Sequence, residues 1–232
     1  MADVVYGQHP VREALRGRRE VLRVWCSRRA RERDAWLPGD AHVVEGGQLD
    51  AMAGSGDHQG VVAEVAPYPY AAADELLGRE RPLLIALDEV TDPHNLGAVA
   101  RVAEGAGADG LLITRRRSAA VTAAVCRASA GAVEHLPISR VENLAETLLR
   151  SRRPGLWTYA AVAGAERRVD QHDYRDGTLF VLGAEGRGIR SRVQRSCDEA
   201  VAIPMRGRIE SLNVSTAAAV LLFEAVRQRV DG

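Results

Sequence analysis

Three short loops of this 232-residue chain carry polar side chains where an apolar strand or helix begins or ends. LDEVTDPHNLGAVAR contains Asn95 and Arg101, LFVLGAEGRG contains Glu185 between glycines, and SLNVSTAAAV contains Asn213. Amide, carboxylate and guanidinium groups hold polar ligands by hydrogen bonds, and glycine lets backbone N–H groups approach a ligand closely. These loops are therefore the first candidates for a binding or catalytic site.

The first loop also has an ordinary structural explanation. Asn95 lies near a helix start and is suited to capping it. Arg101, in an otherwise small and apolar helix, is suited to a solvent-facing position or to an ion pair with Glu104 three residues later. Taken alone, neither residue requires a functional role.

The other two loops are less easily explained by structure. Glu185 is flanked by glycines directly after a buried strand; a surface turn is the ordinary explanation, but glycine there also lets backbone N–H groups approach a ligand closely. Ser211 is the expected cap of the last helix, which places Asn213 in its first turn, where asparagine is a poor helix former. We therefore expect the amide of Asn213 to serve another purpose.

Alternating apolar strands and helices predict how these loops are positioned. We expect a parallel sheet covered by helices on both faces, which classifies the chain as an α/β protein. Ligands of such sheets bind beyond the carboxyl ends of the strands, where the first two loops lie. The expected strands are 83–90, 109–114, 135–141, 156–163, 178–183 and 200–204, and the expected helices are 94–107, 119–131, 142–151, 189–197 and 211–230. In helix 142–151, Leu144, Leu148 and Leu149 are expected to face inward.

A smaller α/β unit is expected before this sheet. Its predicted elements are helices 7–16 and 46–54 and strands 21–26 and 59–65. The proline-containing stretch APYPYAAADELLGRERP then indicates a connection. We divide the chain into a first domain (1–70), a linker (71–81) and a larger domain (82–232).

The first domain carries a local excess of positive charge. Residues 12–33 contain nine arginines and three glutamates, in a chain of zero net charge whose 31 basic residues are all arginine. Arginine suits phosphate and base recognition, so this cluster is a candidate RNA-binding surface. A solvated charged face explains it equally well, and biased codon usage explains the absence of lysine. The candidates are Arg12, Arg16, Arg18, Arg19, Arg28 and Arg29.

Several other classes of protein are disfavoured. Cys26, Cys126 and Cys197 are odd in number and widely spaced, which favours a reducing cytoplasmic location without disulfides or structural zinc. No metal site is indicated by the histidines, and no signal peptide or membrane span is expected. The pattern Gly105-x-Gly107-x-x-Gly110 follows a helix and precedes a strand, the reverse of a dinucleotide-binding motif.

Together the three loops resemble a known family. DPHNLGAVARVAEGAGADGLLI, FVLGAEGRGI and IPM…SLNVSTAAAVLLFEA look like motifs 1, 2 and 3 of the SpoU (TrmH) family, SPOUT-class RNA ribose 2′-O-methyltransferases. The likeness covers about residues 82–229, in the family's order. YGQHPVREAL and HQGVVAEV resemble, over a shorter stretch, the L30e-like substrate-binding domain of RlmB-type members, which modify a guanosine of 23S rRNA.

The resemblance implies a fold, a cofactor and a partner. The larger domain would be a SPOUT catalytic domain with a C-terminal trefoil knot, and its cofactor would be S-adenosylmethionine. The cofactor contacts would fall at Leu182, Gly183, Gly186, Ile203, Met205 and Leu212. The enzyme would be a homodimer, with residues 217–223 of the last helix as part of its interface.

The resemblance also assigns a catalytic set, namely Arg101, Asn95, Glu185 and Asn213. The family assigns proton removal from the ribose hydroxyl to the motif 1 arginine, here Arg101. Arginine is always protonated in proteins. We therefore favour a role in which Arg101 clamps the adjacent phosphate and lowers the hydroxyl pKa, while phosphate or solvent takes the proton.

Two alternatives to a 23S rRNA enzyme remain open. One is a tRNA or antibiotic-resistance rRNA 2′-O-methyltransferase of the same family. The other is a non-catalytic RNA-binding or ribosome-assembly protein that keeps the fold, which the presence of the complete polar set disfavours. An N-terminal domain favours rRNA over tRNA, because minimal tRNA enzymes of the family often lack it.

Overall fold

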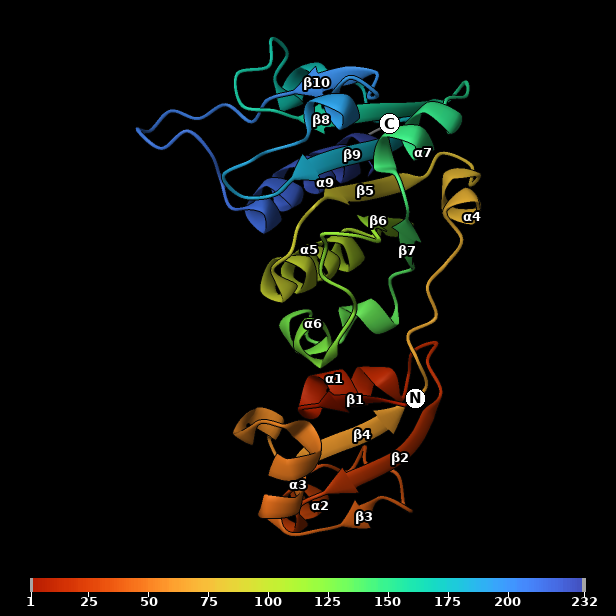
Figure 1. Cartoon of the computed structure of the whole chain (residues 1–232), viewed down its shortest axis with the longest axis vertical. Helices are drawn as coiled ribbons and strands as arrows, with labels where there is room; N and C mark the ends of the chain where they lie inside the picture. Colours follow the sequence, from red (N-terminus) through yellow and green to blue (C-terminus); the bar gives the residue numbers. More distant parts are fainter. Residues whose placement is uncertain (1, 231–232) are drawn as a thin grey trace.

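A computed structural model describes residues 2–230 as a mixed four-stranded sheet followed by a parallel six-stranded sheet (Figure 1). The two units lie end to end along the long axis of the molecule, and the N-terminal unit is coloured red to orange in Figure 1. Within the described residues, no helix is long and apolar enough to cross a membrane.

The N-terminal sheet has the strand order β1-β4-β2-β3. β4 pairs antiparallel with β1 and β2, while β3 runs parallel to β2. The expected helices and strands are confirmed, whereas β1, α2 and β3 were not predicted. The elements are β1 (Asp3–Tyr6), α1 (Gln8–Ala14), β2 (Val21–Cys26), α2 (Arg28–Arg33), β3 (His42–Val43), α3 (Gly46–Ala53), the 3₁₀ turn η1 (Gly56–His58) and β4 (Val61–Val65).

The second sheet has the order β10-β8-β9-β5-β6-β7, and all its strand pairs are parallel. This confirms the predicted α/β class with a parallel sheet. Its strands are β5 (Leu83–Asp88), β6 (Gly110–Thr114), β7 (Ile138–Val141), β8 (Leu156–Ala161), β9 (Gly177–Gly183) and β10 (Glu199–Val201). The trefoil knot stays a prediction of the resemblance, since strand pairing alone does not test it.

Helices cover both faces of this sheet, because its central strands are apolar on both sides. Along β5, Ile85 and Leu87 join the core that contains α5 and α9, while Leu84 and Ala86 join the core that contains α4, α7 and α8. The helices are α4 (Ala73–Leu77), α5 (Pro93–Gly105), α6 (Ala123–Ala128), α7 (Leu144–Arg150), α8 (Ser191–Gln194) and α9 (Val214–Val230), with 3₁₀ turns η2 (Ala132–Glu134) and η3 (Val169–Gln171).

Some local predictions need correction. Leu144 and Leu148 of α7 are buried, but Leu149 is 46% exposed, so its predicted inward orientation is wrong. The helix expected over 119–131 is confined to α6, and a 3₁₀ turn follows it. The Gly105–Gly110 segment connects the end of α5 to β6, which confirms an αβ turn.

The segment predicted as a linker packs on the second sheet. The backbone N–H of Ala71 donates to Ile138 O over 2.8 Å, and Ala71 forms a parallel bridge with Ser139. Leu76 and Leu77 of α4 are buried in the core that also contains Leu144. Residues 71–77 therefore lie fixed against β7 and α7.

A buried ion pair joins the two units. Arg19 is 5% exposed, and its guanidinium contacts both carboxylate oxygens of Glu134, with an Nε–Oε2 distance of 3.2 Å. It also donates to Cys126 Sγ over 3.2 Å, and burial raises the pKa of this thiol to about 12. Removing one partner of such a buried pair costs roughly 3–5 kcal/mol, because the other charge is left buried without a partner.

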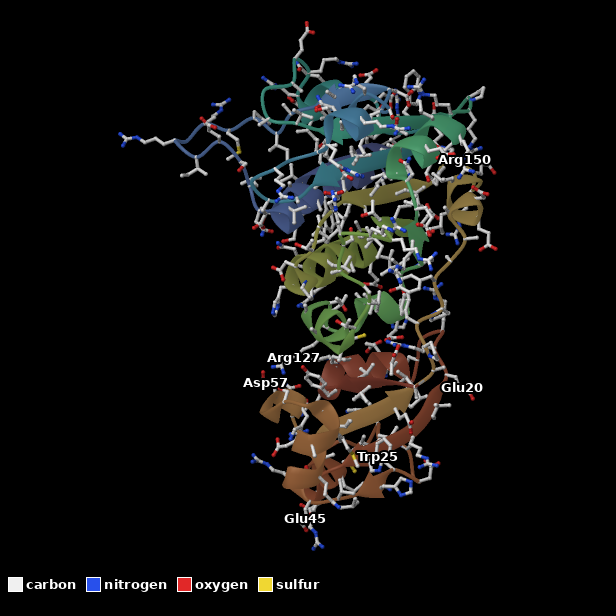
Figure 2. All side chains as sticks on the ribbon, in the orientation of Figure 1. Glu20, Trp25, Glu45, Asp57, Arg127 and Arg150 are labelled. Carbon is white, nitrogen blue, oxygen red and sulfur yellow. The ribbon has the colours of Figure 1, made fainter. Side chains whose placement is uncertain are left out.

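Further contacts cross the same boundary. The hydroxyl of Tyr68 donates to Val133 O over 2.8 Å. Arg127 of α6 pairs with Asp57 of η1 at 3.0 Å, and both side chains are labelled where the two units meet in Figure 2. The first unit therefore lies against α6 and η2, elements that pack in turn on α5.

Candidate active site

One carboxylate oxygen joins the three polar loops. Oε1 of Glu185 accepts a hydrogen bond from Asn95 Nδ2 at 2.9 Å and another from Asn213 Nδ2 at 2.5 Å. Asn213 Nδ2 also donates to Asn95 Oδ1 at 2.9 Å. The loops before α5, after β9 and before α9 therefore meet at one point.

Asn213 is the cap of α9, contrary to the prediction that Ser211 caps it. Its Oδ1 accepts from the backbone N–H of Ser215 at 2.8 Å and from the Ser215 hydroxyl at 2.6 Å. Asparagine is a favoured N-cap residue. The carbonyl of the Asn213 amide therefore starts the helix while its NH₂ group binds Glu185, which answers why an amide is placed here.

Asn95 does not cap α5, so the structural explanation given for it above is wrong. Asp92 is the N-cap and accepts from His94 N at 2.9 Å. Asn95 lies in the first turn of the helix. Its side chain is therefore available for Glu185.

The loop after β9 folds back tightly on its own strand. A Cβ atom on Gly183 would lie 2.0 Å from the carbonyl carbon of Gly188, so no larger residue fits there. Gly186 has φ +76°, a conformation that glycine adopts readily. Gly188 N donates to Ala184 O at 2.8 Å and closes the turn. These glycines fix the position of Glu185.

A cavity of about 800 Å³ lies beside this loop, beyond the carboxyl ends of β9 and β10. It is lined by Glu185 and Asn213 and by all six predicted cofactor-binding residues, Leu182, Gly183, Gly186, Ile203, Met205 and Leu212. Its volume is within the ~300–1,000 Å³ typical of cofactor sites. Apolar side chains together with loop backbone suit a ligand that has both an aromatic ring and polar ends, as S-adenosylmethionine does.

Sequence reasoning missed the pair that anchors this loop. The side chain of Asp88, at the end of β5, is fully buried and accepts from Arg190 N at 2.9 Å and Arg190 Nη2 at 2.6 Å. Hydrogen bonding to Asp88 raises the pKa of Arg190. Arg190 Nη1 also pairs with Glu89 at 3.0 Å. The sequence signal for this pair was an acidic residue, Asp88, at the end of the apolar run LLIAL.

Arg101 lies apart from the three-residue network. It follows Asn95 by six residues on α5, about 9 Å further along the helix axis. Within residues 2–230, no hydrogen bond or ion pair joins its side chain to Asn95, Glu185, Asn213 or Glu104. It is exposed and lines a separate cavity of about 350 Å³ with Glu13, Glu104, Ser129, Ala130, Ala132 and His135.

The arginines predicted to bind RNA occupy different environments. Arg28 and Arg29 are exposed at the start of α2, and Arg16 is exposed beside Glu13 at 3.6 Å. Arg12 is half-buried, and Arg18 donates to Leu136 O at 2.9 Å. The prediction that Arg19 binds RNA is wrong. Arg19 is buried against Glu134, so it is not free to contact RNA.

Comparison with known proteins is consistent with this geometry. The SpoU rRNA methylase family profile matches residues 82–223, and the profile for the substrate-binding domain of RNA 2′-O ribose methyltransferases matches residues 4–71. The chain belongs to the SpoU family of RNA 2′-O-ribose methyltransferases, which use S-adenosylmethionine.

Individual relatives are similar over nearly the whole chain. The 23S rRNA (guanosine-2′-O-)-methyltransferase RlmB of Pseudomonas syringae is 40% identical over 98% of this chain and 96% of its own length. An uncharacterized tRNA/rRNA methyltransferase of Synechocystis is 38% identical over 98% of this chain, which spans 63% of that relative. The crystal structure of AviRb from Streptomyces viridochromogenes with AdoMet is 28% identical, with a TM-score of 0.84, covering 100% of this chain and 91% of that one.

Asp88→Asn is expected to weaken S-adenosylmethionine binding about tenfold, because it removes the negative charge that holds Arg190 and the loop after β9. Titration calorimetry measures the dissociation constant. The control is Asp173→Asn, the same change at an exposed ion pair with Arg175. A folded Asp88→Asn protein with wild-type cofactor affinity would show that the pair does not organise the site.

Proposed function

We propose that this enzyme transfers the methyl group of S-adenosylmethionine to the ribose 2′-hydroxyl of a guanosine in 23S rRNA. The observation that carries the proposal is the junction of Asn95, Glu185 and Asn213 at the edge of a cofactor-sized cavity. The relative RlmB of Pseudomonas syringae supports the choice of substrate. Since its substrate is ribosomal RNA, we place the enzyme in the cytoplasm, which cell fractionation tests.

The cofactor supplies an electrophilic methyl group on a sulfonium. The protein must hold the ribose oxygen in line with the bond that breaks, and such alignment can contribute several kcal/mol to catalysis. The loop after β9 and residues Ile203 and Leu212 would hold the cofactor. Asn95 and Asn213, fixed by Glu185, would orient the ribose.

Arg101 would bind a phosphate of the RNA next to the target ribose. It is exposed about 9 Å along α5 from Asn95, which leaves its guanidinium open to a phosphate of the bound strand. The charge of the guanidinium would lower the pKa of the hydroxyl, and phosphate or solvent would take its proton, because arginine does not release its own.

The N-terminal residues 1–70 would bind the RNA around the target. Exposed Arg16, Arg18, Arg28 and Arg29 support this assignment, and Arg12 is half-buried. Residues 82–232 would form the catalytic domain, and 71–81 the connection between the two.

A homodimer is also proposed, with α9 in its interface. Val220 and Phe223 are three residues apart on one face of α9 and are 36% and 50% exposed. Sedimentation of a Phe223→Glu variant tests this assignment, because a charge in an apolar interface should yield monomers.

The reaction itself is tested with tritiated S-adenosylmethionine and 23S rRNA from a strain that lacks the gene. We expect label on the 2′-oxygen of one guanosine. Arg101→Ala should lower turnover at least about 100-fold while cofactor affinity stays within twofold, since Arg101 lies outside the cofactor cavity. Arg150→Ala, at the end of α7, is the control. Label on a base, or only on tRNA, would contradict the proposed substrate.

Charge reversal tests the N-terminal surface. Arg16→Glu, Arg28→Glu and Arg29→Glu together should weaken RNA binding and make its salt dependence shallower, because each lost phosphate contact removes about 0.7–0.9 from the slope. Filter binding at several salt concentrations measures both quantities. Wild-type affinity and slope in this variant would remove the cluster from the RNA-binding surface.

A further inference from the structure

The turn after β6 exposes three consecutive arginines that the site described above does not use. Arg115, Arg116 and Arg117 lie at the carboxyl end of β6, the strand next to β5. All three are exposed, and the side chains of Arg115 and Arg117 are 63% and 76% exposed. Adjacent like charges repel, so this turn stabilises the fold little through its side chains.

Hydrogen bonds to the neighbouring strand and loop hold the backbone of the turn in place. The hydroxyl of Thr114 donates to Arg116 O at 3.0 Å, Arg115 N donates to Val141 O at 2.8 Å, and Ala119 N donates to Val90 O at 2.9 Å. Arg117 has φ +57°, an unfavourable conformation for an arginine. Such strain persists where the surrounding structure enforces it, and it is concentrated at functional sites.

The ion pairs of these arginines leave most of their charge available. Arg115 pairs with Glu142 at 2.5 Å, but both side chains are more than 60% exposed, and such surface pairs contribute about 0–1 kcal/mol. Arg117 lies 3.7 Å from Glu89. Over the described part of the chain, no hydrogen bond or ion pair involves the side chain of Arg116.

The turn is connected through Glu89 to the loop after β9, which lines the proposed cofactor cavity. Glu89 contacts Arg117 on one side and Arg190 on the other, at 3.7 Å and 3.0 Å. Arg190 ends the loop that carries Glu185, and Glu89 itself has φ +57°. The arginine turn is therefore held next to the loops around the proposed reaction site.

We propose that Arg115, Arg116 and Arg117 form a binding surface for the phosphate backbone of the RNA substrate, on the catalytic sheet and separate from the N-terminal domain. This inference rests on the proposed function. A row of rigidly presented guanidinium groups suits a polyanion, because each can bind a phosphate by two hydrogen bonds. Because β6 lies between β9 and the N-terminal unit (Figure 1), the turn would extend the RNA contact from that unit toward the target nucleotide.

The test compares three proteins: the wild type, a variant with Arg115→Gln, Arg116→Gln and Arg117→Gln, and a control with Arg150→Gln, Arg192→Gln and Arg195→Gln. The control removes the same charge from exposed arginines on α7, on α8 and at the C-terminal end of α8. Measurements are cofactor affinity by calorimetry, affinity for a 23S rRNA fragment at several salt concentrations, and KM for RNA and kcat by tritium transfer.

The Arg115–Arg117 variant should bind RNA about tenfold more weakly, with a shallower salt dependence and a raised KM for RNA. Its cofactor affinity and its kcat at saturating RNA should stay within twofold of wild type. Arg116→Glu alone should also weaken RNA binding and make its salt dependence shallower. This single change breaks no ion pair seen in the structure, so it tests the turn even if the triple variant misfolds.

Two outcomes would overturn the inference. One is wild-type RNA affinity and salt dependence in both the triple variant and Arg116→Glu. The other is an equal loss in the control, which would show that only net charge matters. Failure of the proposed function is a different result, since the wild-type protein would then transfer no methyl group to RNA while the binding comparison still decides the role of the turn.

Discussion

The organisation of this enzyme depends on one carboxylate. Oε1 of Glu185 accepts from Asn95 and from Asn213, side chains that come from loops 90 and 28 residues away in the sequence. Asn213 is held on both sides of its amide, because its Oδ1 also accepts the hydrogen bonds that start α9. Loss of this oxygen would break both hydrogen bonds. The loop after β9 would then no longer be linked through them to the starts of α5 and α9.

The rest of the fold makes this meeting possible. Parallel strands place their carboxyl ends at one edge of the sheet. Since β5 and β9 are adjacent strands, the loops that follow them lie next to each other. Gly183 then allows the loop after β9 to turn back on itself, and Asp88 fixes its end through Arg190. Buried Arg19 and Glu134 hold the N-terminal unit against the helices that pack on α5. Fixed contacts thus connect the cavity, the Asn95–Glu185–Asn213 network and the proposed RNA-binding surfaces.

Much of this arrangement could be predicted from the sequence. Wholly apolar runs such as LLIAL identify buried parallel strands, and three motifs in family order predict that Asn95, Glu185 and Asn213 converge. Arg101 was predicted with them, yet it lies on another part of α5. Its six-residue separation from Asn95, about 240° of rotation, already implied a different helix face.

What could not be predicted depends on contacts between distant segments. Nothing local distinguishes Arg19 from its neighbouring arginines, because its burial comes from packing of the two units. Asp88 and Arg190 are 102 residues apart, and only the folded sheet brings them together. β1 and β3 are too short to show a periodic pattern, and they are specified by their partners β4 and β2.

A crystal structure with bound S-adenosylmethionine tests the central claim most directly. We predict that the cofactor occupies the cavity between the loop after β9 and the start of α9, with its methyl group facing the side chains of Asn95 and Asn213 while both remain bonded to Glu185. A cofactor bound elsewhere, or a Glu185 carboxylate that separates from both amides when the cofactor binds, would contradict this account.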